Sequence, residues 1–193
     1  MRTCLFSMMV FALVVSAVRA EEPAKAPSAE EVMKQMAAAG QPGPEHKRLE
    51  PFVGTGETTT NMFMVPSAQP LEMQATVEWE WIMGGRFVQE KVRGTAEKPY
   101  EALGLMGYDR AKQKYTNVYL CGMAGMMFYA ESTCDEAGKV FTSVSEQQCP
   151  LTGGPIQCRD EIVIESPNRI VVRSYHTTDG KESLAMEMIQ TRK

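Results

Sequence analysis

Alternation of apolar and polar residues dominates the chain from about residue 52 onward. In the clearest case, 71–82, apolar side chains recur at every second position and Glu, Gln and Thr occupy the positions between them. A period of two residues is the pattern of a strand with one buried face. By this pattern the predicted strands are 58–65, 71–82, 86–93, 100–108, 115–121, 126–134, 139–149, 156–165, 170–176 and 183–192.

These strands follow one another at short intervals, with Gly-Gly, Asp-Arg, Ala-Gly, Pro-Asn and Asp-Gly pairs between them. That spacing is typical of an up-and-down antiparallel sheet. Closing the sheet into a barrel removes its free edges, and the uniformly short connections favour a barrel over a two-sheet sandwich. The sequence predicts an all-β antiparallel barrel of about ten strands, a size that is able to hold a small ligand.

The first 50 residues have a different character. Residues 1–20 combine a lone Arg2, an apolar run and small residues at Val18 and Ala20, the pattern of a secretory signal peptide. We therefore expect an exported protein, periplasmic or extracellular, with no stable membrane span; a retained anchor is the alternative. Residues 21–27 form a flexible linker, 28–50 a helical segment and 51–193 the barrel domain.

A helix is expected to begin after Ser28, because Glu31 stands three residues later and completes a capping box. Its apolar stripe, Val32, Met33, Met36 and Ala37, is expected to pack on the core. The net charge of the whole chain is −4, and removal of residues 1–20 takes away Arg2 and Arg19 and no acid. An acidic, mixed surface disfavours phosphate backbones, so we expect no nucleic-acid partner.

Four spaced motifs resemble the bacterial DUF1579 family: HKRLEPFVGT (46–55), WIMGGRFVQE (81–90), ALGLMGYDRAKQKY (102–115) and DGKESLAMEMIQTRK (179–193). The resemblance implies a lipocalin-like, calycin-type barrel in an exported bacterial protein, with no established activity. It also implies a Trp where this chain has Gly56. Such a Trp closes the barrel end and packs on an Arg of the last strand, here Arg192, so Gly56→Trp is expected to stabilise the protein.

Four cysteines follow the predicted signal peptide, and an oxidising compartment favours disulfides. Cys149 and Cys158 flank a loop that contains Gly153 and Gly154. A symmetric hairpin would place them opposite each other, so we predict that pairing first among three connectivities. Cys121 and Cys134 do not fall opposite each other and are expected to stay reduced.

The sequence gives weak signals for chemistry. The sulfur atoms of Cys121, Met123, Met126 and Met127 gather around one turn, a soft set that suits Cu(I), although Met more often fills irregular cores. His176 is expected to be a surface residue near a turn, because nothing places it with Ser174 and Asp179 in a triad. Haem ligation by His176, as in nitrobindin-type barrels, is a further alternative. We expect no cofactor.

The leading functional hypothesis is a non-enzymatic binder of a small apolar ligand inside the barrel. Alternation alone selects the candidate lining residues, which are Met73, Val77, Trp79, Trp81, Tyr108, Tyr119 and Met186. The competing hypothesis is a structural or interaction module whose barrel is filled by its own side chains. The sequence indicates no oligomeric state.

Overall fold

The computed structural model describes residues 26–63, 69–95, 100–149 and 152–193. The predicted signal peptide and most of the linker lie outside these residues. The N-terminal segment contains helix α1 (Ala29–Ala39), the short helix α2 (Pro44–Lys47) and a single 3-10 turn, η1 (Glu50–Phe52). None of the described helices is long and apolar enough to cross a membrane.

Ten strands follow η1. They are β1 (Gly54–Met62), β2 (Leu71–Ile82), β3 (Phe87–Gly94), β4 (Glu101–Asp109), β5 (Lys114–Cys121), β6 (Met126–Cys134), β7 (Val140–Gln148), β8 (Pro155–Ser166), β9 (Arg169–Thr178) and β10 (Lys181–Arg192). The alternating pattern therefore located every strand. The first strand begins at Gly54, four residues before the position predicted from the pattern.

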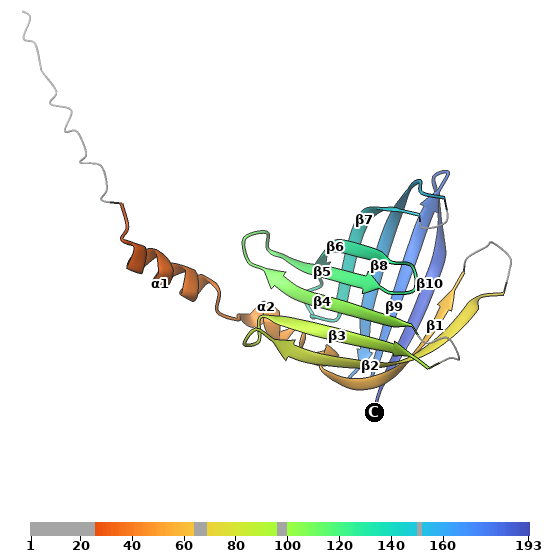
Figure 1. The fold of residues 1–193 in the computed structure, drawn as a ribbon, viewed down its shortest axis with the longest axis horizontal. Coiled ribbons are helices and arrows are strands. Elements are labelled where there is room, and N and C mark those ends of the chain that lie inside the picture. Colours follow the sequence, from red (N-terminus) through yellow and green to blue (C-terminus); the bar gives the residue numbers. More distant parts are fainter. Residues whose placement is uncertain (1–25, 64–68, 96–99, 150–151) are drawn as a thin grey trace, which may run out of the picture.

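The strands pair in chain order, and β1 also pairs with β10, so the sheet closes into an antiparallel barrel (Figure 1). This confirms the predicted fold class. Strands β3–β6 run across the view of Figure 1 and β7–β10 run up it, so the sheet is strongly coiled. In this order β3 and β8 lie on opposite walls, because four strands separate them in either direction.

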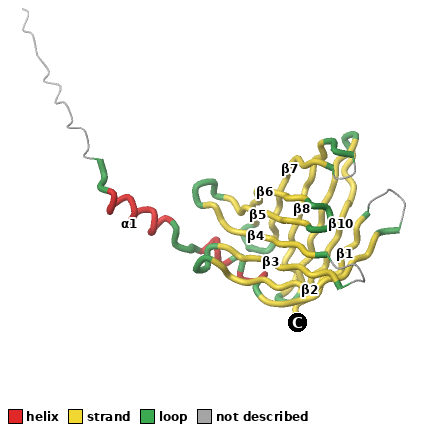
Figure 2. The backbone as a smooth tube through the Cα atoms, viewed as in Figure 1, coloured by secondary structure: helices red, strands yellow, loops and turns green. Residues whose placement is uncertain are grey.

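One junction of the barrel is much shorter than the others. Strands β6 and β7 are paired only from Ser132 opposite Ser143 to Cys134 opposite Phe141. Beyond Ser132 the two strands share no ladder, although each is fully paired on its other side. The tube view in Figure 2 shows β7 rising with β8 while β6 stays beside β5. The barrel is thus closed mainly at one end, which we call the floor.

The floor is filled by an aromatic and aliphatic core. Phe52 from η1 is 2% exposed and packs on Trp79 and Phe141, with ring centroids 5.3 and 5.6 Å away. Arg192 donates from Nη2 to the carbonyl oxygens of Pro51 and Val53 and so holds η1 against the end of β10. The other buried members of this core are Leu49, Val88, Met106, Tyr115, Ile164 and Ile170.

These contacts correct the expectation for Gly56. Its φ is not in the left-handed region, so the backbone itself would accept another residue. A β-carbon at Gly56, however, would lie 2.6 Å from the backbone carbonyl oxygen of Thr191 on β10. Glycine is therefore required for the close approach of β1 and β10, and Phe52 occupies the end of the barrel instead of a Trp. Gly56→Trp is expected to destabilise the protein.

Helix α1 has the predicted capping box. The Glu31 backbone N donates to Ser28 Oγ at 3.2 Å, and the Ser28 backbone N donates to Glu31 Oε2 at 2.7 Å. The expected packing of its apolar stripe was wrong, because no residue of α1 is buried and Met33 and Met36 are about two-thirds exposed. Only the helix end contacts the barrel: Arg110 Nη1 donates to the carbonyl oxygen of Ala39 at 2.9 Å. Figure 1 accordingly shows α1 projecting away from the barrel.

Candidate ligand-binding site

The lumen of the barrel has two zones that differ in exposure. At the floor, inward-facing side chains such as Val88, Met106 and Phe141 are at most 1% exposed. Further along the same faces, inward-facing residues such as Met73, Tyr119 and Met186 are only half-buried. The strand ends of this second zone meet at the opposite end of the barrel, which we call the mouth. These three side chains near the mouth are therefore more accessible to solvent than the core residues of the floor.

The seven candidate lining residues all fall on the inward side of the alternation, but they occupy different depths. Val77 is 3% exposed and belongs to a small buried cluster with Ala75, Val92 and Ala102. Trp79, Trp81 and Tyr108 pack against the floor core. Met73, Tyr119 and Met186 lie nearer the mouth. Of the seven residues, Met73, Tyr119 and Met186 are the ones placed where they could touch a ligand, and the other four belong to the core or pack against it.

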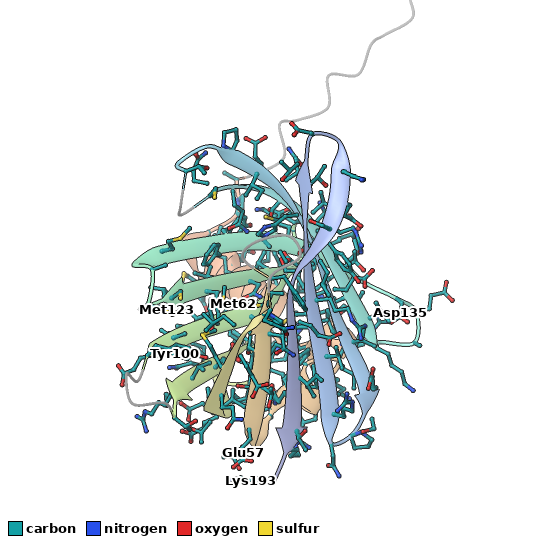
Figure 3. The ribbon with its side chains drawn as sticks, turned by 90° about the vertical axis from the view of Figure 1, so that its right-hand side faces the viewer. Glu57, Met62, Tyr100, Met123, Asp135 and Lys193 are labelled. Carbon is teal, nitrogen blue, oxygen red and sulfur yellow. The ribbon has the colours of Figure 1, made fainter. Side chains whose placement is uncertain are left out.

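The wall formed by β10, β1 and β2 is rich in methionine. Met62 stands opposite Met186, and Thr60 lies between Met188 on one side and Met73 on the other. In Figure 3, Met62 lies well above the labelled Glu57 and Lys193. Those two residues form an ion pair, with 2.7 Å between Lys193 Nζ and Glu57 Oε1. Unbranched thioether side chains adapt to irregular apolar shapes, so this wall can accept an apolar ligand body.

A buried carboxyl group lies on the opposite side of the lumen. Glu90 on β3 is 5% exposed and makes no hydrogen bond or ion pair with any described residue. Burial raises the pKa of Glu90 from 4.5 to about 8. A β-carbon at Gly104 on β4 would lie 2.7 Å from Glu90 Oε2, so the missing side chain of Gly104 leaves the space that the carboxyl group fills.

The neighbours of Glu90 are aromatic. The ladders place Trp79 and Gly104 opposite Glu90, and Tyr119 opposite Gly104, which makes one row across four strands. Burial is the main cause that raises the pKa of Tyr119, and the nearby Glu90 contributes. The indole Nε1 of Trp79 is a buried donor with no acceptor among the described residues. This row therefore carries hydrogen-bonding groups, among them Trp79 Nε1, that have no partner within the described part of the chain.

A second carboxyl group lies on the wall formed by β7, β8 and β9. Asp160 stands between Ser143 and Ser174 in the ladder. Ser174 Oγ donates to Asp160 Oδ1 at 2.6 Å, and Ser143 Oγ donates to Asp160 Oδ2 at 3.3 Å. Asp160 alternates with Ile162, which packs on the core, and is therefore on the inner face. Adjacent Glu161 points outward and pairs with Arg159.

His176 and Cys158 form the next row toward the mouth, directly opposite each other on β9 and β8. Burial lowers the pKa of His176 below 6.5, although nearby Asp160 acts in the opposite direction, so the imidazole is neutral at pH 7. Burial raises the pKa of Cys158 to about 11, which keeps the thiol protonated. The expectation of a surface histidine was wrong, because β9 extends to Thr178 and carries His176 on its inner face.

The ladder between β7 and β8 overturns the predicted disulfide. Cys158 pairs with Ser145, whereas the backbone N of Cys149 donates to the carbonyl oxygen of Gly154 at 2.8 Å. The hairpin is therefore tighter than a symmetric loop between the two cysteines. The two positions are offset by four residues, or about 13 Å along a strand, against a disulfide limit of about 7 Å between Cα atoms. No disulfide joins cysteines within the described residues.

The four candidate copper ligands do not form one cluster. Cys121 and Met126 are a cross-strand pair on the inner face. Met127 points outward and is 69% exposed, and Met123 lies in the turn and is 52% exposed. Among the described residues, no group of three or more His, Cys, Asp or Glu side chains is arranged to hold a metal ion. The alternation of β6 separates neighbouring sulfur atoms onto opposite faces.

Two cavities lie at the floor end of the barrel. One of about 470 Å³ is bounded by η1, the turn before Arg169 and Arg192. The other, of about 300 Å³, lies between the N-terminal segment and the ends of β4, β5 and β6, and Tyr108 lines it. Of the seven candidate lining residues, Tyr108 alone lines either of these two cavities.

The ten-stranded barrel with a floor closed by its N-terminal segment agrees with the family motifs. The family model DUF1579, protein of unknown function, matches residues 41–192. The chain belongs to the DUF1579 family. No curated protein sequence matches it.

Two solved structures share the fold of this DUF1579 protein. Rv2717c from M. tuberculosis is 15% identical with a TM-score of 0.57, and the match covers 79% of this chain and 99% of that one. The S-type phycobiliprotein lyase CPES from Guillardia theta is 13% identical with a TM-score of 0.54, and the match covers 81% and 96%. At these identities the likeness shows the lipocalin-like barrel fold alone.

Sequence reasoning missed the two carboxyl groups of the lumen. The signal for Glu90 was present, because Val88, Glu90 and Val92 share one face of an alternating segment. Asp160 shares a face with Ile162 in the same way. Asp160 was treated as half of a solvated pair with Glu161, and Glu90 was not considered; the direction of the neighbouring apolar residues shows that both turn inward.

Proposed function

We propose that this DUF1579 protein binds a small molecule with an apolar body in the mouth half of its lumen, without catalysing a reaction. One observation carries the proposal: the inward-facing side chains of Met73, Tyr119 and Met186 near the mouth are only half-buried, above a floor whose side chains are fully buried. A lumen of this kind offers apolar walls with a few polar groups, as ligand sites do. The shared fold with the phycobiliprotein lyase is compatible with ligand binding in the lumen.

The competing hypothesis is a structural module with a filled barrel. The tightly packed core of the floor supports it. The two hypotheses differ in the mouth half. A binder leaves accessible apolar wall there, whereas a filled barrel takes up no ligand. The half-exposed Met73 and Met186 favour the binder.

A fluorescence titration tests the proposal. The uncharged probe N-phenyl-1-naphthylamine is added to the full protein at pH 7, and its emission is followed. Ala130→Trp places a large side chain on the inner face of β6, whereas Met127→Trp adds the same side chain to the outer face of the same strand. We expect saturable binding by the wild type and Met127→Trp, and at least tenfold weaker binding by Ala130→Trp.

Two results would overturn the proposal. The first is no saturable enhancement with the wild type, which would support a filled barrel. The second is equal binding by all three proteins, which would place the probe on the outer surface. Circular dichroism spectra of both variants check that the barrel remains folded.

We propose in addition that the protein is exported, on the strength of the pattern in residues 1–20. Intact-mass analysis of protein recovered from its own host tests this. Cleavage after Ala20 in protein from outside the cytoplasm is the expected result. A chain that retains residues 1–20 and stays in the cytoplasm would refute the export.

A further inference from the structure

Two carboxyl groups face the lumen between the floor and the rim of the mouth, and no cation lies beside them among the described strand residues. Glu90 on β3 and Asp160 on β8 face the lumen from opposite walls. Among the described strand residues, the cations on the inward side of the alternation are Arg192, at the floor, and Lys181, exposed at the rim of the mouth. The other lysines and arginines of the described strands point outward, where most of them pair with acids such as Glu161, Glu182 and Glu187.

Neither lumen carboxyl group has a cationic partner among the described residues. Asp160 accepts hydrogen bonds from two serine hydroxyls and takes part in no salt bridge. Glu90 is 5% exposed and makes no hydrogen bond or ion pair with these residues, and its raised pKa of about 8 keeps it mostly protonated at pH 7. His176 is close to Asp160 but is neutral at pH 7, because its burial disfavours the charged form. A buried acid without a counter-charge is unfavourable unless a partner supplies one.

A ligand can supply the missing charge. A primary ammonium group donates three hydrogen bonds, and its charge-assisted bonds to carboxylates are stronger than neutral ones. A carboxylate ligand would instead meet the Asp160 carboxylate, which costs binding energy and acts as selection against that class. The apolar remainder of the ligand would lie on the methionine wall made by Met62, Met73, Met186 and Met188.

We infer that the lumen selects amphiphilic amines, with the ammonium group held at Asp160 and facing Glu90 and the apolar chain on the methionine wall. This rests on the proposed function, since it names the ligand class of the same lumen. The position of Asp160 fits the role, because it lies above the floor core and is half-exposed from the mouth. The serines on either side fix both of its oxygens, so the carboxylate is already oriented before the ligand arrives.

Competition with the same uncharged probe tests the inference. Octylamine, octanol and octanoate have equal chain lengths and differ in headgroup charge at pH 7. We expect octylamine to displace the probe from the wild type at concentrations at least tenfold below those of octanoate, with octanol between them. This comparison needs no variant.

Two variants locate the selectivity. Asp160→Asn removes the inward charge with little change of shape, and Glu161→Gln removes one charge from the adjacent residue on the outer face. We expect Asp160→Asn to bind octylamine no better than octanol, and Glu161→Gln to keep the preference of the wild type. Equal losses in both variants would assign the preference to overall charge and overturn the inference.

The remaining outcomes also decide. Equal or stronger displacement by octanoate from the wild type would refute the amine selectivity while leaving ligand binding intact. An amine preference retained in Asp160→Asn would refute the assigned contact. If the probe itself does not bind to the wild type, the proposed function fails and the inference falls with it.

Discussion

The buried carboxyl group of Glu90 should make the free energy of unfolding depend on pH. Because the folded-state pKa of about 8 lies above the unfolded value of 4.5, the unfolded chain ionises first as the pH rises. The contribution of Glu90 to stability is therefore fully present below pH 4.5 and is lost progressively between pH 4.5 and pH 8. Above pH 8 both states are ionised and the contribution no longer changes.

The magnitude follows from the size of the shift. Each pKa unit corresponds to about 1.4 kcal/mol, so the full window is worth about 5 kcal/mol. Between pH 5 and pH 7 the free energy of unfolding of the wild type should fall by about 2.5 kcal/mol relative to a variant that cannot titrate at this position. Other groups titrate over the same range, but they are common to both proteins and cancel in the difference.

Urea unfolding at pH 5, 6, 7 and 8 measures this difference. Glu90→Gln keeps the shape of the side chain, and Glu90→Met replaces it by an apolar one of similar length. The two variants will differ from each other by a constant, since an unpaired buried amide has its own cost. Both should gain stability relative to the wild type as the pH rises, with the same slope.

Two results would refute the reasoning. A difference that stays flat from pH 5 to pH 8 would show that Glu90 is solvated in the folded protein. A wild type that gains stability relative to both variants as the pH rises would show that a nearby cation stabilises the ionised carboxylate. The second result would also contradict the inference that the lumen carboxyl groups have no cationic partner.

Three further predictions concern the floor. Gly56→Ala should destabilise the protein by about 1–3 kcal/mol, because the new β-carbon would clash with the backbone of Thr191. Gly154→Ala is the control and should leave thermal unfolding unchanged, since its β-carbon meets only Thr152 Oγ1 at 3.6 Å. Equal melting temperatures for the two variants would contradict the clash. Phe52→Ala should cost about 3–5 kcal/mol in urea unfolding, and a loss below 1 kcal/mol would mean that η1 does not close the barrel. Arg192→Met should cost about 1–3 kcal/mol by leaving the carbonyl groups of η1 without their donor, and unchanged stability would exclude this contact.

The positions of the strands and their inward faces could be predicted from local sequence patterns. A two-residue period is a local property, so each segment shows its buried side without knowledge of its partners. The turn glycines and the capping box at Ser28 are local in the same sense, and each appears where the sequence places it. Closure into a barrel also followed from the sequence, because many short-linked strands leave edges that only closure removes.

The register, the floor and the polar groups of the lumen depend on contacts between distant segments and could not be predicted in this way. The offset between Cys149 and Cys158 depends on how tightly one hairpin turns, and a four-residue difference separates two cysteines that a symmetric loop would join. The role of Gly56 depends on how closely β10 approaches β1, a distance between segments far apart in the chain. Closure of the barrel sets β3 opposite β8, so Glu90 and Asp160 lie on facing walls. The cost of burying such a group depends on which groups face it across the lumen, and no local pattern shows those.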